Sequence, residues 1–359
     1  MNLARSVRIC IFRGINPMTP RQDKILGGLL CAAIGDSMGA PTEVRTTEMI
    51  KEKFGGLVKD LIQSPMDNYG RGQVTGLVTD DFSVSFYSCL ACLDGGGVIN
   101  RDNAAKGMFV WIDHPEYSRN AGPTTLTAIA KLQGKEVPPE RPLKCINNRA
   151  SNGAPMKSGF IGLLDAGNID KAIDDTITLC EITHNNTLAL SGAAAIAAAT
   201  AEAMKPGSSY IECVEAGIYG AEEGFKRAKA TARPVAGASI VKRIRLAVDI
   251  GMRRQGNFDM AMKELSEIIG GGLPANEAVP AAFGYIVATK GDPMQTIYMA
   301  VNAGDDTDTV ACMAGYIVGA LGGYKKLNPR YLEMIEKENN FDLQGTALRI
   351  DALLGREEI

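Results

Sequence analysis

Histidine is scarce in this sequence: His114 and His184 are the only two among 359 residues. A zinc site built on a histidine pair would therefore need both of them together, which argues against one. The patterns GxxxxGK[ST], GxGxxG and HExxH are all absent. Their absence removes the sequence support for P-loop nucleotide binding, Rossmann dinucleotide binding and zincin-type proteolysis.

An excess of one charge is also missing, since 38 Lys and Arg stand against 41 Asp and Glu, giving a formal charge of −3. This balance offers no general electrostatic basis for binding nucleic acid or an anionic membrane, so we expect neither partner. No uninterrupted apolar run reaches the roughly 18 residues of a membrane span. The eight cysteines, in a chain without a recognisable secretory segment, predict reduced thiols and a cytoplasmic location. Cys89 and Cys92 form a CxxC inside an apolar helical run, and core packing is the favoured interpretation.

Apolar residues recur at spacings of three and four along much of the chain, whereas alternating strand patterns are sparse. This periodicity predicts helices over 23–33, 82–93, 187–204, 211–229, 239–252, 257–268, 293–302, 309–321 and 328–337. The segment 187–204 is so rich in alanine that we expect a buried central helix. The sequence therefore predicts an all-α protein.

Glycine and proline mostly mark connections between helices, and no shift in composition or charge divides the chain. We therefore expect one catalytic domain over 21–359, preceded by a disordered leader over 1–20. The region 112–160 is the most loop-like, and we expect segments that face the substrate there.

Two acidic clusters stand just before predicted helices, more than two hundred residues apart: Thr79-Asp80-Asp81 and Asp305-Asp306-Thr307-Asp308-Thr309. Helix capping alone would explain one carboxylate at each helix start. Several adjacent acids repel one another and call for a cation, and an all-oxygen ligand set is what Mg²⁺ prefers. If the clusters meet in space, a metal site is the favoured interpretation.

Five segments, in order along the chain, together carry a family resemblance: GGLLCAAIGDSMGAPTE (27–43), GLVTDD (76–81), SNGAPMK (151–157), ITHN (182–185) and AVNAGDDTDTVACMAGYIVGALGG (300–323). On these motifs the chain resembles the ADP-ribosylglycohydrolase family, the ADP-ribosyl-acceptor hydrolases that include the dinitrogenase reductase-activating glycohydrolase. The resemblance covers nearly the whole chain.

The resemblance implies a compact, orthogonal multi-helix all-α fold with a binuclear metal centre at the mouth of an ADP-ribose cleft. The cofactors it implies are two Mg²⁺, sometimes Mn²⁺. The ligands carried over are Thr79, Asp80, Asp81, Asp306, Asp308 and Thr309. Glu43 matches a position near the metals that is implicated in ligation or gating, although an exposed loop acid is the alternative. For Asp36, a structural cap is favoured over a carboxylate behind the ligands.

For the substrate, the resemblance implies that the loop 151–157 holds the diphosphate through its backbone amides. The expected binding residues are Ser151, Asn152, Gly153, Ala154, Met156 and His184. Small residues in this loop let a phosphate approach the main chain. A packed or capping role for His184 is the alternative to binding.

Three residues depart from the family pattern. Phe82 stands where Thr or Ser is common, Pro155 has no N–H to donate to a phosphate, and Lys157 replaces a common Arg and so lacks its planar fork. The metal half of the motif set is intact, whereas the diphosphate half is altered. The alteration leaves room for a substrate that keeps a ribosyl group without a full ADP moiety.

The expected function is that of a metal-dependent glycosidase. It would cleave the bond between ADP-ribose and an acceptor on a modified protein or a small conjugate, with Asp80, Asp81, Asp306 and Glu43 as catalytic residues. A ribosyl hydrolase acting on nucleosides or nucleotides, or an ADP-ribose binder without turnover, are the alternatives.

Overall fold

The computed structural model of the protein describes residues 17–137 and 150–357. Within these ranges the regular secondary structure is helical and no strand is present, which confirms the all-α prediction. The first nine α-helices are α1 (Pro20–Gly39), α2 (Thr47–Phe54), α3 (Asp80–Asp94), α4 (Arg101–Ile112), α5 (Pro115–Ser118), α6 (Pro123–Leu132), α7 (Gly159–Leu164), α8 (Ile169–His184) and α9 (Thr187–Ala203). They are followed by α10 (Tyr210–Ala228), α11 (Ile240–Arg253), α12 (Phe258–Ile268), α13 (Ala275–Ala288), α14 (Pro293–Ala300), α15 (Thr307–Gly322), α16 (Pro329–Asn339) and α17 (Leu343–Glu357). Two short 3₁₀ helices are η1 (Pro155–Lys157) and η2 (Tyr324–Lys326).

All of the helices expected from the apolar periodicity are present, although the first is longer at both ends than the expected 23–33. Several other helices were not expected. One of them, α13, contains Pro280. A proline in the interior of a segment removes a backbone hydrogen bond and so normally argues against a helix there. The loop-like region 112–160 contains α5 and α6, so the expectation of loops there is wrong for those residues. The leader expected over 1–20 lies largely in residues 1–16, outside the described residues, and Thr19 already caps α1.

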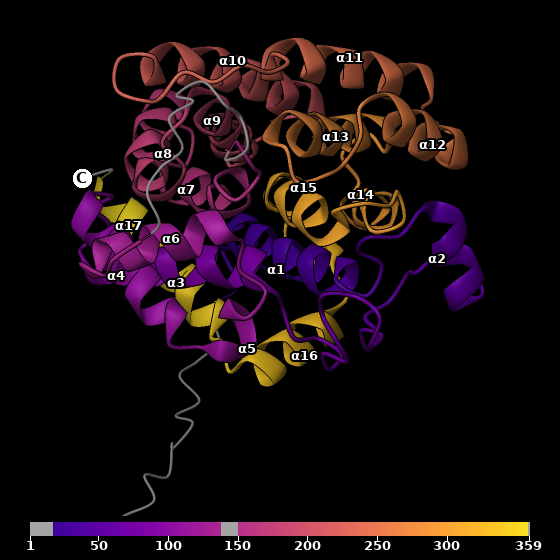
Figure 1. Cartoon of the computed structure of the whole chain (residues 1–359), viewed down its shortest axis with the longest axis horizontal. Helices are drawn as coiled ribbons and strands as arrows, with labels where there is room; N and C mark the ends of the chain where they lie inside the picture. The colour runs from indigo at the N-terminus through magenta and orange to yellow at the C-terminus, as the bar shows by residue number, and fades with distance from the viewer. Residues whose placement is uncertain (1–16, 138–149, 358–359) are drawn as a thin grey trace, which may run out of the picture.

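Helices α1 and α15 lie side by side near the middle of the molecule (Figure 1). Glycines on both helices bring the two backbones into contact. A Cβ atom added to Gly315 would lie 2.6 Å from the carbonyl oxygen of Cys31, and one added to Gly39 would lie 2.5 Å from the Cα atom of Asp308. Side chains at these positions would push the helices apart. The close approach therefore places the start of α15 against the end of α1.

The alanine-rich helix α9 is buried along its whole length, as the sequence predicts. It packs against α8, α10, α7, α13 and α15, so it is a central element of the fold. Alanine suits this place because its small side chain lets neighbouring helices approach closely and also favours the helical state.

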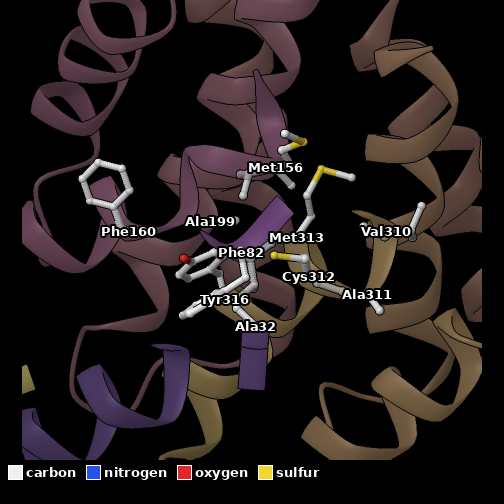
Figure 2. Close-up of a cluster of buried hydrophobic side chains, with 14 of the residues drawn as sticks. Ala32, Phe82, Met156, Phe160, Ala199, Val310, Ala311, Cys312, Met313 and Tyr316 are labelled. Carbon is white, nitrogen blue, oxygen red and sulfur yellow. The ribbon is translucent and has the colours of Figure 1, made fainter. Parts of the chain in front are cut away.

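Aromatic and apolar side chains fill the space behind the starts of α3 and α15. Phe82 is fully buried, with its ring centroid 6.1 Å from that of Tyr316, and Figure 2 shows both beside Cys312 and Ala32. Cys89 and Cys92 are also fully buried, which confirms core packing for the CxxC. Among the described residues no helix is both long and apolar enough to cross a bilayer.

Candidate metal centre

The two acidic clusters meet. The Thr309 hydroxyl at the start of α15 donates a hydrogen bond to Asp81 in the first turn of α3, at 2.9 Å. Carboxylate oxygens of Asp36, Asp81 and Asp308 lie within 4.8 Å of one another, and so do those of Glu43, Asp306 and Asp308. Asp308 belongs to both groups. The sequence could not show whether the two clusters lie together. In the structure they do.

Helix α1 positions the first cluster. Both carboxylate oxygens of Asp36 accept backbone N–H groups, from Thr79 at 2.9 Å and from Phe82 at 2.8 Å. These are donors that the start of a helix leaves without intrahelical partners. Asp36 therefore caps α3 from a neighbouring helix, as favoured from the sequence. Thr79 is 3% exposed, and its hydroxyl donates a hydrogen bond to the Asp81 carboxylate at 3.2 Å.

The second cluster is fixed against the end of α1 and the segment that follows it. The Thr307 hydroxyl donates to the carbonyl oxygen of Gly39 at 3.0 Å. The Val44 N–H donates to the carbonyl oxygen of Asp305 at 2.9 Å. Arg45 donates to Asp67 and to the backbone oxygens of Pro41 and Glu43, so it holds this segment without neutralising the Glu43 carboxylate.

Burial and mutual repulsion make these carboxylates hard to ionise. Desolvation, followed by the nearby charge of Asp36, raises the pKa of Asp80 to about 7. Desolvation and then the charge of Asp306 raise the pKa of Glu43 to about 8. The pKa values of Asp81 and Asp308 are raised well above the ordinary range for the same two reasons. Among the described residues none of these acids has an ion-pair partner, and a bound cation would favour their ionised forms.

The donor set fits a hard divalent cation. Both close groups consist of carboxylate oxygens, with no thiol and no imidazole in either. Oxygen ligands of this kind suit Mg²⁺ and Mn²⁺. Asp80 belongs to neither close group, although it lines the same cavity.

The loop expected to bind the substrate is attached to this centre. The Asn152 side-chain amide donates to the Asp306 carboxylate at 2.6 Å, and the Asn152 N–H donates to the Leu273 carbonyl at 2.8 Å. His184, the last residue of α8, is 2% exposed and contacts Ser151. Ala154 is fully buried and does not border the cavity, unlike the other expected binding residues.

A cavity of about 610 Å³ lies over these residues. It is lined by Glu43, Tyr69, Arg71, Asp80, Asp81, Arg119, Asn120, Ala121, Gly122, Pro123, Thr124, Thr125, Ser151, Asn152, Gly153, Met156, His184, Leu273, Asp306, Asp308 and Thr309. The sequence analysis missed Tyr69, Arg71 and Leu273, which no motif marks. The stretch 119–125 falls in the region 112–160 where substrate-facing segments were expected.

Comparison with known proteins agrees with the motifs. A model of the ADP-ribosylglycohydrolase family matches residues 17–358. The uncharacterized protein YegU of Escherichia coli K12 is 29% identical over 331 residues, covering 90% of this chain and 94% of its own. An uncharacterized protein of Archaeoglobus fulgidus is 27% identical over 307 residues, covering 84% and 88%. A solved chain described as an ADP-ribosylglycohydrolase-related protein complex aligns with a TM-score of 0.65 at 20% identity, covering 93% of this chain and 99% of that one, which supports the same fold.

Proposed function

Because this chain belongs to the ADP-ribosylglycohydrolase family, we propose that it is a metal-dependent hydrolase that cleaves the glycosidic bond between ADP-ribose and an acceptor. The acceptor is a side chain of a modified protein or a small conjugate. The observation that carries the proposal is the meeting of Asp81, Asp306 and Asp308 on one wall of a cavity large enough for a small ligand.

Two divalent cations, Mg²⁺ or Mn²⁺, would be held at this wall by Thr79, Asp80, Asp81, Asp306, Asp308 and Thr309. The sharing of Asp308 by two close groups of oxygens supports a pair of ions rather than one. The raised pKa values of the buried acids support it as well, because two cations would offset the repulsion that opposes their ionisation.

The ribosyl bond breaks through an oxocarbenium-like state, which requires an oriented ribose, a delivered water and a protonated leaving group. The chemistry that divalent ions supply when bound is orientation of sugar hydroxyls and a lowered pKa for water. The protein keeps the ligand oxygens in place, since Thr309 holds Asp81 and Asn152 holds Asp306. We assign the transfer of protons to Glu43 or to an oxygen of Asp80, which are the half-buried acids of the cavity.

The diphosphate would lie along Ser151, Asn152, Gly153 and Met156, beside His184. Gly153 suits this wall, because a Cβ atom there would lie 2.7 Å from Nε2 of His184. Ala154 does not line the cavity and is left out of this binding set. Lys157, which replaces a common Arg, is 1% exposed and does not line the cavity.

The experiment is a turnover assay on the purified full chain after removal of metal with a chelator. Peptides carrying ADP-ribose on arginine or on serine, and a small ADP-ribosyl conjugate, are incubated with Mg²⁺, with Mn²⁺ or with chelator, and released ADP-ribose is quantified. We expect release only with added metal, and none from Asp308→Asn. Chelator-resistant release would contradict the proposed metal dependence.

The same assay separates the alternatives. Nucleosides and nucleotides serve as a second substrate panel, and turnover confined to that panel would assign the ribosyl hydrolase activity instead. Calorimetric titration with ADP-ribose, on the same sample, identifies a binder without turnover. Either result would overturn the ADP-ribosyl hydrolase assignment while leaving the family membership intact.

A further inference from the structure

A lysine side chain is buried directly behind the cavity wall. Lys157 ends η1 and is 1% exposed. Its Nζ donates a hydrogen bond to the Thr183 hydroxyl in the last turn of α8. Within the described part of the chain no carboxylate forms an ion pair with it. Burying a lysine amine costs folding free energy unless the amine is well paired, so the hydrogen bonds around Lys157 require an explanation.

The hydrogen-bond chain continues to the cavity. The Thr183 hydroxyl lies 2.9 Å from Nδ1 of His184. On the other side of the ring, Nε2 lies 3.2 Å from the Ser151 hydroxyl. Both His184 and Ser151 line the cavity. One continuous row of polar atoms therefore joins a buried lysine to a hydroxyl that faces the cavity.

The direction of the row follows from the donors available. An ammonium has no acceptor, so the Thr183 oxygen accepts from Lys157. The Thr183 proton has two acceptors within reach, Nδ1 of His184 at 2.9 Å and the Cys180 carbonyl at 3.4 Å, and the shorter contact is the better hydrogen bond. A histidine that accepts at Nδ1 carries its proton on Nε2. Nε2 then donates to the Ser151 oxygen, and the Ser151 hydroxyl proton is available to another acceptor.

We propose that Lys157 is a positioning residue that, through Thr183, fixes the Nε2–H tautomer of His184 and turns the Ser151 hydroxyl proton toward an anionic group of the substrate. Lys157 does not line the cavity, so it acts through the other residues. That the anionic group is a diphosphate rests on the proposed function. The tautomer does not, because it is a property of the free protein.

The test is ¹⁵N NMR of the histidine side chains in the full chain without substrate. Since His114 is the only other histidine and does not line the cavity, His114→Gln leaves one imidazole to observe. We expect the spectrum of that protein near neutral pH to show a bare Nδ1 and a protonated Nε2. A proton on Nδ1 would overturn the proposal.

Matched variants test whether the hydrogen bonds of this row set the tautomer of His184. Thr183→Val keeps the shape but removes the hydroxyl, whereas Thr183→Ser keeps the hydroxyl. In the His114→Gln background we expect Thr183→Val and Lys157→Met to lose the tautomer preference and Thr183→Ser to keep it. An unchanged spectrum in Thr183→Val would overturn the proposal. If Lys157→Met does not fold, the two Thr183 variants decide the question.

The consequence for binding is measured by titrating the same proteins with ADP-ribose in the presence of Mg²⁺. Loss of one hydrogen bond to a charged group corresponds to about a 10-fold weaker affinity. We expect that loss in Thr183→Val and in Ser151→Ala, and wild-type affinity in Thr183→Ser. The expected tautomer together with no ADP-ribose binding by the wild type would support the hydrogen-bond row and contradict the proposed function.

Discussion

The hydroxyl of Thr309 donates a hydrogen bond to the carboxylate of Asp81 over 2.9 Å, although 228 residues separate the two. This contact joins the first turn of α15 to the first turn of α3. It brings together acids from two separate helix starts. Within residues 17–137 and 150–357 no basic side chain forms an ion pair with these buried acids. Capping does not require that arrangement, and the proposed divalent metal centre accounts for it.

Replacement of Asp81 by Asn removes an anionic oxygen from the cluster. We expect it to reduce metal-dependent turnover about 100-fold or more, since charge stabilisation by a metal is worth several kcal/mol. The folded state should persist, because the change also relieves repulsion among buried acids. The matched control is Asp102→Asn, which removes an exposed acid from the first turn of α4. Equal activity in the two purified variants would indicate that Asp81 is only a helix-start acid.

The Asn152 amide orients Asp306 at 2.6 Å. We expect Asn152→Ala to weaken binding of Mg²⁺ or Mn²⁺ about 10- to 100-fold, the usual effect of removing a partner of a metal ligand. Isothermal titration of the metal-free protein measures it. Asn276→Ala is the control, since that half-buried side chain donates to the Ala238 carbonyl and does not line the cavity. Unchanged affinity in Asn152→Ala would refute the role given to the amide.

The metal-free protein should lose stability as the pH rises. Desolvation in the fold is the main cause that raises the pKa of Asp36 to about 6, of Asp80 to about 7 and of Glu43 to about 8. The folded state therefore binds more protons than the unfolded chain, and stability present below about pH 4 is lost as the pH passes through these values. We expect the Tm in chelator to fall between about pH 6 and pH 8, and added Mg²⁺ to restore it most at the upper end. A flat or rising Tm in chelator would be inconsistent with the buried cluster.

The close packing of α1 on α15 should be needed for metal binding. Gly315→Ala would place a Cβ atom 2.6 Å from the Cys31 carbonyl oxygen. We expect this substitution to lower the free energy of unfolding, measured by chemical denaturation, by about 1–3 kcal/mol. It should also weaken metal binding, because α1 carries Asp36 and α15 carries Asp308. Gly355→Ala in α17, where the nearest atom is 3.5 Å away on the Arg21 side chain, is the control and should not destabilise the protein. Wild-type stability and metal affinity in Gly315→Ala would show that the two helices need not be this close.

The starts of α3 and α15 could be predicted because polar clusters precede strongly periodic apolar segments. Their meeting could not, since it depends on contacts of Gly39 and Gly315 across α1 and α15 that no local pattern specifies. The motif SNGAPMK suggested a phosphate loop, but the orientation of Lys157 away from the cavity follows from the turn of η1. Tyr69 and Arg71 carry no motif at all, so only the folded chain places them at the cavity.

The most direct measurement is anomalous diffraction from crystals of the full chain soaked with Mn²⁺. The account predicts anomalous peaks bound by carboxylate oxygens of Asp81, Asp306 and Asp308, and loss of those peaks in crystals of Asp308→Asn. Crystals in which the soaked Mn²⁺ binds elsewhere, with these three carboxylates still in contact with protein atoms alone, would contradict it.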